Sequence, residues 1–157
     1  MGNLPQIGEL APNFIANNQE EKAVKLDNFK SQWLVLYFYP KDNTPGCTTE
    51  AKDFTEYTPE FQSLGATILG VSPDTEKSHV KFMDKHSLGI QLLSDRDHKV
   101  AEAYGVWGLK KFMGQEYMGI IRSTFLIDPD GKISYIWTKV RVKNHVQTVL
   151  NKLKELK

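Results

Sequence analysis

The chain has 157 residues, 40% of them hydrophobic and 25% charged, which is the composition of an ordinary globular protein and predicts one domain over residues 1–157. Lys and Arg number 20 and Asp and Glu number 19, so the net charge of +1 gives no electrostatic reason to expect a nucleic-acid or membrane partner. The longest apolar run, residues 33–39, is too short to cross a bilayer, and the N-terminus lacks the basic start and apolar core of a secretion signal. We therefore expect a cytoplasmic protein.

The first strongly patterned elements surround residue 40. Residues 33–39 (WLVLYFY) are apolar at odd and even positions alike, which predicts a central strand covered on both faces. Pro40 ends this strand, a turn-rich loop follows, and a helical pattern begins at Cys47. The Thr58-Pro59 pair predicts a break in that helix, followed by a second short helix that Gly65 ends.

Strands and helices continue to alternate in the rest of the chain. The sequence Ser72-Pro73-Asp74 predicts a helix start with serine as the cap, and Gly89 predicts the end of that helix. The sequence DPDG at residues 128–131 predicts the turn of a β-hairpin. The other predicted elements are strands at 66–71, 91–93, 123–127 and 133–137 and helices at 100–104 and 142–156.

This order of elements predicts an α/β fold, a three-layer sandwich with a central mixed β-sheet flanked by helices. Mixed strand directions are expected, because the hairpin must be antiparallel whereas helical crossovers favour parallel pairs. Ligands of such sheets gather at the carboxyl ends of the strands. Cys47 follows the central strand and is therefore expected at that edge.

Cys47 is the only cysteine, which excludes a disulfide within the chain. An isolated cysteine is most often a buried structural residue. Here, however, residues 40–46 (PKDNTPG) contain no large apolar side chain, and the first turn of a helix favours an anion through its unpaired N–H groups. Gly46 would allow the backbone to come close to a small ligand. These features leave a structural and a reactive cysteine as open alternatives.

A motif around the cysteine favours the reactive alternative. Pro40, Thr44 and Cys47 match the pattern Pro-x-x-x-Thr-x-x-Cys, and in this the chain resembles the peroxiredoxins, thiol peroxidases built on a thioredoxin-like fold. The longer run LYFYPKDNTPGCTTEAKDF resembles the peroxiredoxin Q group, also called bacterioferritin comigratory proteins. The similarity continues in ILGVSPD, LLSD and GVWGLKKFMGQEYMGIIRSTFLIDPDGKI, and it covers nearly the whole chain. Together these segments are highly specific.

The resemblance implies a mechanism and a set of site residues. In this family the cysteine thiolate attacks a peroxide oxygen, water or alcohol is released, and a sulfenic acid remains. The resemblance implies that Thr44 places its hydroxyl at the sulfur, that Pro40 shields the sulfur from water, and that Arg122 points at the sulfur. Glu50 matches a carboxylate that often orients this arginine, and the backbone N–H groups of Gly46 and Cys47 would bind the peroxide. No cofactor is expected, and the implied role is antioxidant defence.

The chain departs from many members of the group because it lacks a second, resolving cysteine. Lys52 and Met83 stand where other members carry one. The sulfenic acid cannot close an internal disulfide, so the resemblance implies a one-cysteine mechanism with an external reductant: thioredoxin, glutaredoxin with glutathione, or a small thiol. Overoxidation to sulfinic acid becomes a hazard, because no internal thiol traps the intermediate. A monomer or a weak homodimer is expected.

Other functions are weighed against this one. A thiol–disulfide oxidoreductase would need a second cysteine before Cys47, and a redox-inactive binding or chaperone domain on the same fold would not react with peroxide. A metal site is not expected, because the four histidines lack ligand spacing and are predicted to be surface residues; they are His79, His86, His98 and His145. Lys110 and Lys111 are predicted to lie in an exposed loop.

Overall fold

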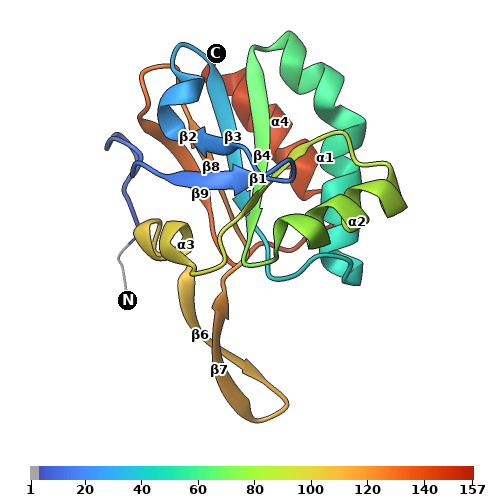
Figure 1. Cartoon of the computed structure of the whole chain (residues 1–157). Helices are drawn as coiled ribbons and strands as arrows, with labels where there is room; N and C mark the ends of the chain where they lie inside the picture. The colour runs from blue at the N-terminus through green and yellow to red at the C-terminus, as the bar shows by residue number, and fades with distance from the viewer. Residues whose placement is uncertain (1–3) are drawn as a thin grey trace.

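The structure, a computed structural model, describes residues 4–157 and consists of a seven-stranded mixed sheet with helices on both faces (Figure 1). The strand order is β2-β1-β5-β4-β3-β8-β9. The strands of this sheet are β1 (Ile15–Asn18), β2 (Ala23–Lys25), β3 (Trp33–Phe38), β4 (Ala66–Ser72), β5 (Gln91–Ser94), β8 (Ser123–Ile127) and β9 (Ile133–Trp137). The helices are η1 (Leu26–Phe29, a 3₁₀ turn), α1 (Pro45–Ser63), α2 (Glu76–His86), α3 (Lys99–Ala103) and α4 (His145–Leu156).

Strand β3 lies inside the sheet, parallel to β4 and antiparallel to β8, as the sequence predicts for a mixed sheet. Its side chains alternate between two apolar cores because both faces are covered. Leu34, Leu36 and Phe38 join one core, whereas Val35 and Tyr37 join the other. The predicted three-layer α/β sandwich is confirmed.

The two faces of the sheet are covered differently (Figure 1). Helices α1, α2 and α4 pack on one face and contribute Phe54, Phe82 and Val149 to its core. The short helix α3 and the segment before β1 cover the other face, where Val100 and Phe14 are buried. The long helices therefore lie on the side of the sheet that carries Cys47.

Helix α1 is unbroken, so the predicted interruption at Thr58-Pro59 is wrong. Proline within a helix removes one backbone hydrogen bond and costs ~3 kcal/mol. Phe54 and Phe61 are fully buried on either side of it, and each buried phenylalanine contributes about 1.5–3 kcal/mol. The packing outweighs the local preference of the proline. Gly65, in the left-handed region with a φ of 75°, follows the end of α1.

Helix α2 begins later and ends earlier than predicted. Ser72 is not a cap: it is the last residue of β4, it pairs with Ser94, and its hydroxyl donates to Asp74. The cap is Thr75, whose side-chain oxygen accepts a hydrogen bond from the N–H of Ser78. The helix ends at His86 and not at Gly89, because Ser87 already adopts the left-handed conformation.

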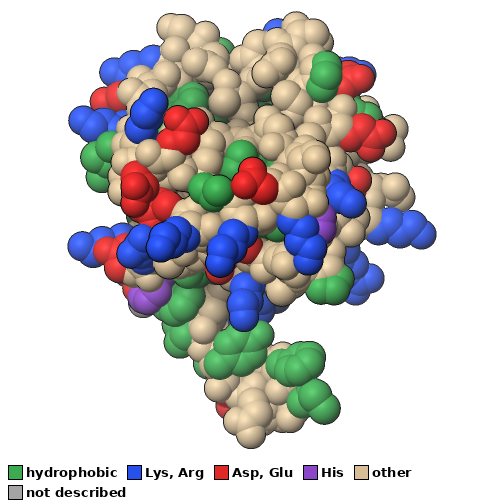
Figure 2. All heavy atoms as spheres, turned by 45° about the vertical axis from the view of Figure 1, so that its right-hand side comes forward, with side chains coloured by type: hydrophobic (Ala, Val, Ile, Leu, Met, Phe, Trp, Pro, Cys, Tyr) green, Lys and Arg blue, Asp and Glu red, His purple; other side chains and the backbone are tan. Residues whose placement is uncertain are grey.

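A second, two-stranded sheet projects from the body of the protein, formed by β6 (Trp107–Phe112) and β7 (Gln115–Ile120) (Figure 1). Lys110 and Lys111 lie in the strand β6, so the predicted loop is wrong, although Lys111 is exposed as expected. The tip residues Met113 and Gly114 both have positive φ, which matches the twist of a two-residue hairpin turn. Figure 2 shows hydrophobic side chains gathered on this hairpin, where Met113 is 86% exposed. Within residues 4–157, no helix is long and apolar enough to cross a membrane.

The proline inside α1 gives a stability prediction. Pro59→Ala is expected to raise the free energy of unfolding by about 2 kcal/mol, because ~3 kcal/mol of helix penalty is removed and ~1 kcal/mol of restriction on the unfolded chain is lost. Urea unfolding followed by circular dichroism measures the change. Glu60→Ala, at the next exposed position, is the control and is expected to change stability little, since both residues are good helix formers. An unchanged or lower stability of Pro59→Ala would contradict the prediction.

Candidate active site

Cys47 lies in the first turn of α1 and is 1% exposed. The N–H groups of Gly46 and Cys47 are among those that have no carbonyl partner four residues back in a helix. Thr44 precedes the helix at the N-cap position, yet its side chain does not cap it. The Thr44 hydroxyl donates instead to the carbonyl of Lys41, over 2.9 Å, so the first-turn N–H groups are left for another acceptor.

Arg122 reaches the sulfur from the other side of this loop. Its Nη2 donates to Cys47 Sγ over 3.2 Å. The antiparallel register pairs Ser123 with Phe38, which sets Arg122 beside the carboxyl end of β3, where the cysteine loop begins. A Cβ atom at Gly46 would stand 3.4 Å from the same guanidinium nitrogen, so a residue without a side chain keeps this side of the arginine open.

Glu50 holds the second nitrogen of the same guanidinium. It lies one helical turn after Cys47 on the same face of α1, and its Oε1 accepts from Arg122 Nη1 over 2.6 Å. Glu50 is fully buried, and within the described residues its Oε2 has no hydrogen-bond partner. Burial raises the pKa of Glu50 from its ordinary 4.5 to about 7, although the Arg122 charge acts in the opposite direction. The Arg122 guanidinium thus binds both the sulfur of Cys47 and the carboxyl group of Glu50, which lie three residues apart in the sequence.

The predicted site residues therefore come together in two groups. Arg122 is in direct contact with both Cys47 and Glu50. Pro40 follows the end of β3 and is half-buried in the loop that also carries Thr44. The arrangement can hold a thiolate against a guanidinium and can offer N–H donors to a small ligand.

The comparisons with known proteins agree with this geometry. Residues 7–136 match the AhpC/TSA family. The chain belongs to the AhpC/TSA family. It is 52% identical over 151 residues to peroxiredoxin Bcp of Bacillus subtilis (strain 168), with 96% of each chain covered. It is also 44% identical over 148 residues to peroxiredoxin Bcp of Escherichia coli (strain K12), with 94% of this chain and 95% of that protein covered.

Solved structures of related proteins have the same fold. A bacterioferritin comigratory protein of Xanthomonas campestris, described by its alkyl peroxide reduction activity and trapped intermediate and ligand complexes, is 42% identical with a TM-score of 0.86 over 90% of each chain. A cysteine-to-serine mutant of PrxQ from Xylella fastidiosa is 40% identical with a TM-score of 0.92 over 98% of each chain. The present AhpC/TSA protein is a peroxiredoxin with a thioredoxin-like fold, and its activity is that of a thiol peroxidase, which uses a peroxide and a thiol reductant.

Lys110 is a neighbour of the site that the sequence did not indicate. It comes from β6, is half-buried, and its Nζ donates to the carbonyl of Ile120 over 2.8 Å. Burial lowers the pKa of Lys110, and the nearby Arg122 charge lowers it further. The sequence would have indicated Lys110 as a neighbour of the site only if the β6–β7 hairpin had been predicted. The pairing of these two strands brings Lys110 back towards Arg122.

Two of the four histidines are buried, which corrects the prediction that all are surface residues. His79 is 0% exposed and contacts Asp42, whereas His145 is buried against Thr124. Burial lowers the pKa of His145 to about 4, with a further contribution from Arg122, so the ring is neutral at neutral pH. His86 and His98 are half-exposed. Among residues 4–157, no three His, Cys, Asp or Glu side chains are grouped to hold a metal ion.

The buried Glu50 gives a pH-dependent prediction. The folded protein binds the Glu50 proton more tightly than the unfolded chain does, so this stabilisation is fully present below pH 4.5 and is lost as the pH rises to about 7. The loss is on the order of 3 kcal/mol. The free energy of unfolding of the wild type minus that of Glu50→Gln is therefore expected to fall across this range and to level off above it. Urea unfolding at a series of pH values measures this difference. The contributions of other titrating groups such as His145 cancel, because they are the same in both proteins. A difference independent of pH would contradict the prediction.

Proposed function

We propose that Cys47 reduces hydrogen peroxide and organic hydroperoxides through a sulfenic acid. The observation that supports this most is the 3.2 Å contact between Arg122 Nη2 and Cys47 Sγ in a buried first helical turn. The thiolate attacks one peroxide oxygen, the O–O bond breaks, and the second oxygen leaves with the bonding electrons. That oxygen takes up a proton and departs as water or alcohol, while the sulfur, oxidised by two electrons, remains as sulfenic acid.

Each neighbouring residue has a role in this proposal. Arg122 stabilises the thiolate and the charge that develops on the leaving oxygen, and Glu50 fixes the orientation of the guanidinium. The Thr44 hydroxyl already donates to Lys41, so its oxygen is free to accept a hydrogen bond from the peroxide. The N–H groups of Gly46 and Cys47 bind a peroxide oxygen, and Pro40 shields the sulfur from water.

Ionisation of the thiol alone does not account for a fast peroxidase. Lowering the pKa of a thiol from ~8.5 to ~6 raises the thiolate fraction at pH 7 by about 30-fold. The same change lowers nucleophilicity by about 10- to 18-fold for a Brønsted slope of ~0.4–0.5, so the net gain is roughly two- to threefold. The remaining acceleration must come from holding the peroxide in line and stabilising the leaving oxygen.

Substitutions can separate the effect of thiol ionisation from the effect of positioning the peroxide and stabilising its leaving oxygen. Arg122→Ala is expected to lower the rate constant for peroxide by about 100- to 1,000-fold, and Thr44→Val by about tenfold, with much smaller changes in the thiolate fraction. Stopped-flow kinetics measure the rate, and the ultraviolet absorbance of the thiolate measures the ionised fraction. Thr49→Val is the matched control, because the exposed Thr49 hydroxyl bonds only the Pro45 carbonyl. Equal losses in rate and thiolate fraction would show that ionisation is the main effect.

The reductant is an external thiol in this proposal, because Cys47 is the only cysteine. Two thiols return the sulfenic acid to the thiol, forming a disulfide between themselves and one water. Thioredoxin, or glutaredoxin with glutathione, would supply these thiols, and the enzyme would act in the cytoplasm as a monomer or weak homodimer. The alkyl peroxide reduction described for the Xanthomonas campestris relative supports organic hydroperoxides as substrates.

A one-cysteine cycle predicts a particular product after oxidation. One equivalent of hydrogen peroxide without thiol is expected to add a single oxygen to Cys47, trapped as sulfenic acid and detected by mass spectrometry. Excess peroxide is expected to convert it to sulfinic acid, because no internal thiol competes. Steady-state turnover with thioredoxin, with glutathione plus glutaredoxin, and with dithiothreitol then identifies the donor. An unmodified Cys47 after peroxide treatment would overturn the proposed function.

A further inference from the structure

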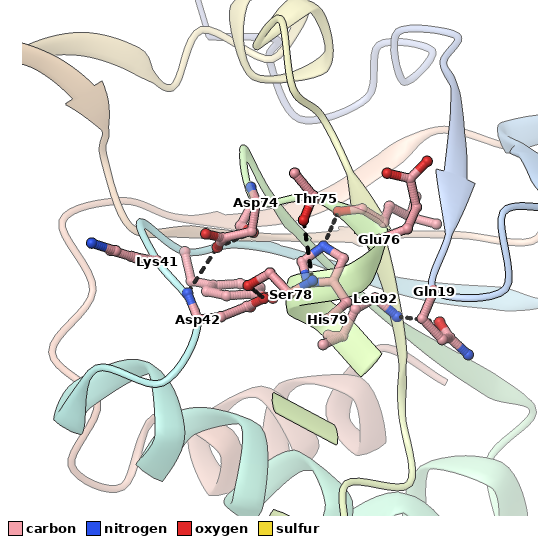
Figure 3. A network of polar contacts seen from close by, with 12 residues as sticks. Gln19, Lys41, Asp42, Asp74, Thr75, Glu76, Ser78, His79 and Leu92 are labelled. Carbon is pink, nitrogen blue, oxygen red and sulfur yellow. Dashed lines mark hydrogen bonds and ion pairs between the residues drawn. The ribbon is translucent and has the colours of Figure 1, made fainter. Parts of the chain in front are cut away.

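A buried carboxylate anchors the loop that carries the site. Asp42, in the loop between β3 and α1, is 7% exposed. Its Oδ1 accepts from the hydroxyl of Tyr39 over 2.6 Å, and its Oδ2 lies 2.8 Å from Ser78 Oγ and 2.7 Å from His79 Nδ1. Figure 3 shows Asp42 beside Ser78 and His79, two residues of α2. Three side chains thus converge on this one carboxyl group.

His79 supplies the charge opposite this carboxylate. Its ring is 0% exposed, with Nδ1 against Asp42 and Nε2 3.0 Å from the carbonyl oxygen of Leu93. Both partners are acceptors, so both contacts form only when both ring nitrogens carry a proton. Within the described residues, Asp42 is the only charged group in hydrogen-bond contact with the ring, and the Tyr39 hydroxyl stands 3.5 Å from Nδ1. The geometry fits an imidazolium paired with a carboxylate.

The backbone of the same residue is tied down as well. The N–H of Asp42 donates to Asp74 Oδ2 over 2.8 Å (Figure 3). That oxygen also accepts from Ser72 Oγ over 2.7 Å. Asp74 lies between β4 and α2. Asp42 therefore holds the loop through both its side chain and its main-chain N–H. The partners outside the loop lie in α2 and in the connection that precedes it.

The position of Asp42 in the loop connects this anchor to the site. It lies between Pro40 and Thr44, and the neighbouring Lys41 carbonyl accepts the hydroxyl of Thr44. A shift of Asp42 would move that carbonyl, and with it Thr44 at the start of α1. A buried ion pair is also a weak source of stability, because desolvation offsets much of the attraction. The position of the loop, rather than the stability of the fold, is therefore what the Asp42–His79 pair is expected to determine.

We propose that the hydrogen bond between His79 and Asp42 positions the loop that presents Thr44 and Cys47 to the peroxide. Neither residue touches the sulfur; both act through the loop, and the inference rests on the proposed function of Cys47. A displacement of about 1 Å in a reacting group can lower a rate by roughly 100-fold, so loss of the anchor has a measurable effect.

Two isosteric substitutions of His79 separate its two contacts. His79→Asn keeps an N–H near the place of Nδ1 and so keeps the donation to Asp42, whereas His79→Gln keeps only the donor that faces Leu93. In single-turnover reaction with hydrogen peroxide, His79→Asn is expected to stay within about threefold of the wild type, and His79→Gln to be slower by roughly 10- to 100-fold. The rate at which preformed sulfenic acid is reduced by dithiothreitol is expected to stay unchanged or to rise in His79→Gln, because a displaced loop still admits the thiol. Equal peroxide rates in the two variants would overturn the proposal.

A second buried carboxylate provides the control for lost stability. Asp95 is buried and accepts the N–H groups of Val100 and Ala101, in the core on the opposite face of the sheet. Asp42→Asn is expected to lower the peroxide rate by at least about tenfold, while Asp95→Asn is expected to lower stability and keep the rate. Equal rate losses in both would overturn the proposal.

The charge on the pair can be observed without any variant. Nitrogen-15 NMR of the wild type at neutral pH is expected to show a proton on both ring nitrogens of His79. A ring Nδ1 without a proton would overturn the proposed hydrogen bond from His79 to Asp42. A wild type that does not react with peroxide would instead overturn the proposed function, so the two failures are distinguishable.

Discussion

The site depends on one guanidinium placed between two buried groups of the same helix. Arg122 contacts the sulfur of Cys47 with one nitrogen and the carboxyl of Glu50 with the other. The helix sets the two acceptors one turn apart, and the β3–β8 register brings the arginine to them. Cys47 and Glu50 are nearly inaccessible to water, so their interactions with the cation are stronger than the same contacts would be at the surface. The sheet therefore fixes the position of the guanidinium beside the sulfur through the pairing of β3 with β8.

The loop between β3 and α1 cannot be held mainly by apolar packing, because residues 40–44 are mostly polar. Polar contacts hold it instead. Asp42 is bonded to α2 by its side chain and to the β4–α2 connection by its N–H. Asn43 in the left-handed region, with a φ of 63°, reaches His86 at the end of α2 through a 2.9 Å contact. The first turn of α1 thus rests on a fixed base, to which the buried Tyr39 at the start of the loop adds its own hydrogen bond to Asp42.

Much of the fold and the centre of the site could be predicted from the sequence. The unbroken apolar run at 33–39 predicted the central strand, and the spacing of Pro40, Thr44 and Cys47 singled out the cysteine that the structure places against Arg122. The errors arose where distant packing outweighed a local preference. Pro59 stays in α1 because Phe54 and Phe61 are buried around it, and Lys110 is in a strand because it pairs with β7. His79 seemed a polar helix residue because its partner is 37 positions away, a distance at which no spacing rule applies.

The burial of Cys47 has a consequence for recycling. A peroxide presents a small oxygen to the sulfur, but a reducing thiol brings a carbon chain and must approach along the axis of the bond it breaks. A residue that is 1% exposed cannot accept that approach while the first turn of α1 is wound. The first turn of α1 must therefore open before such a thiol can reach the sulfur.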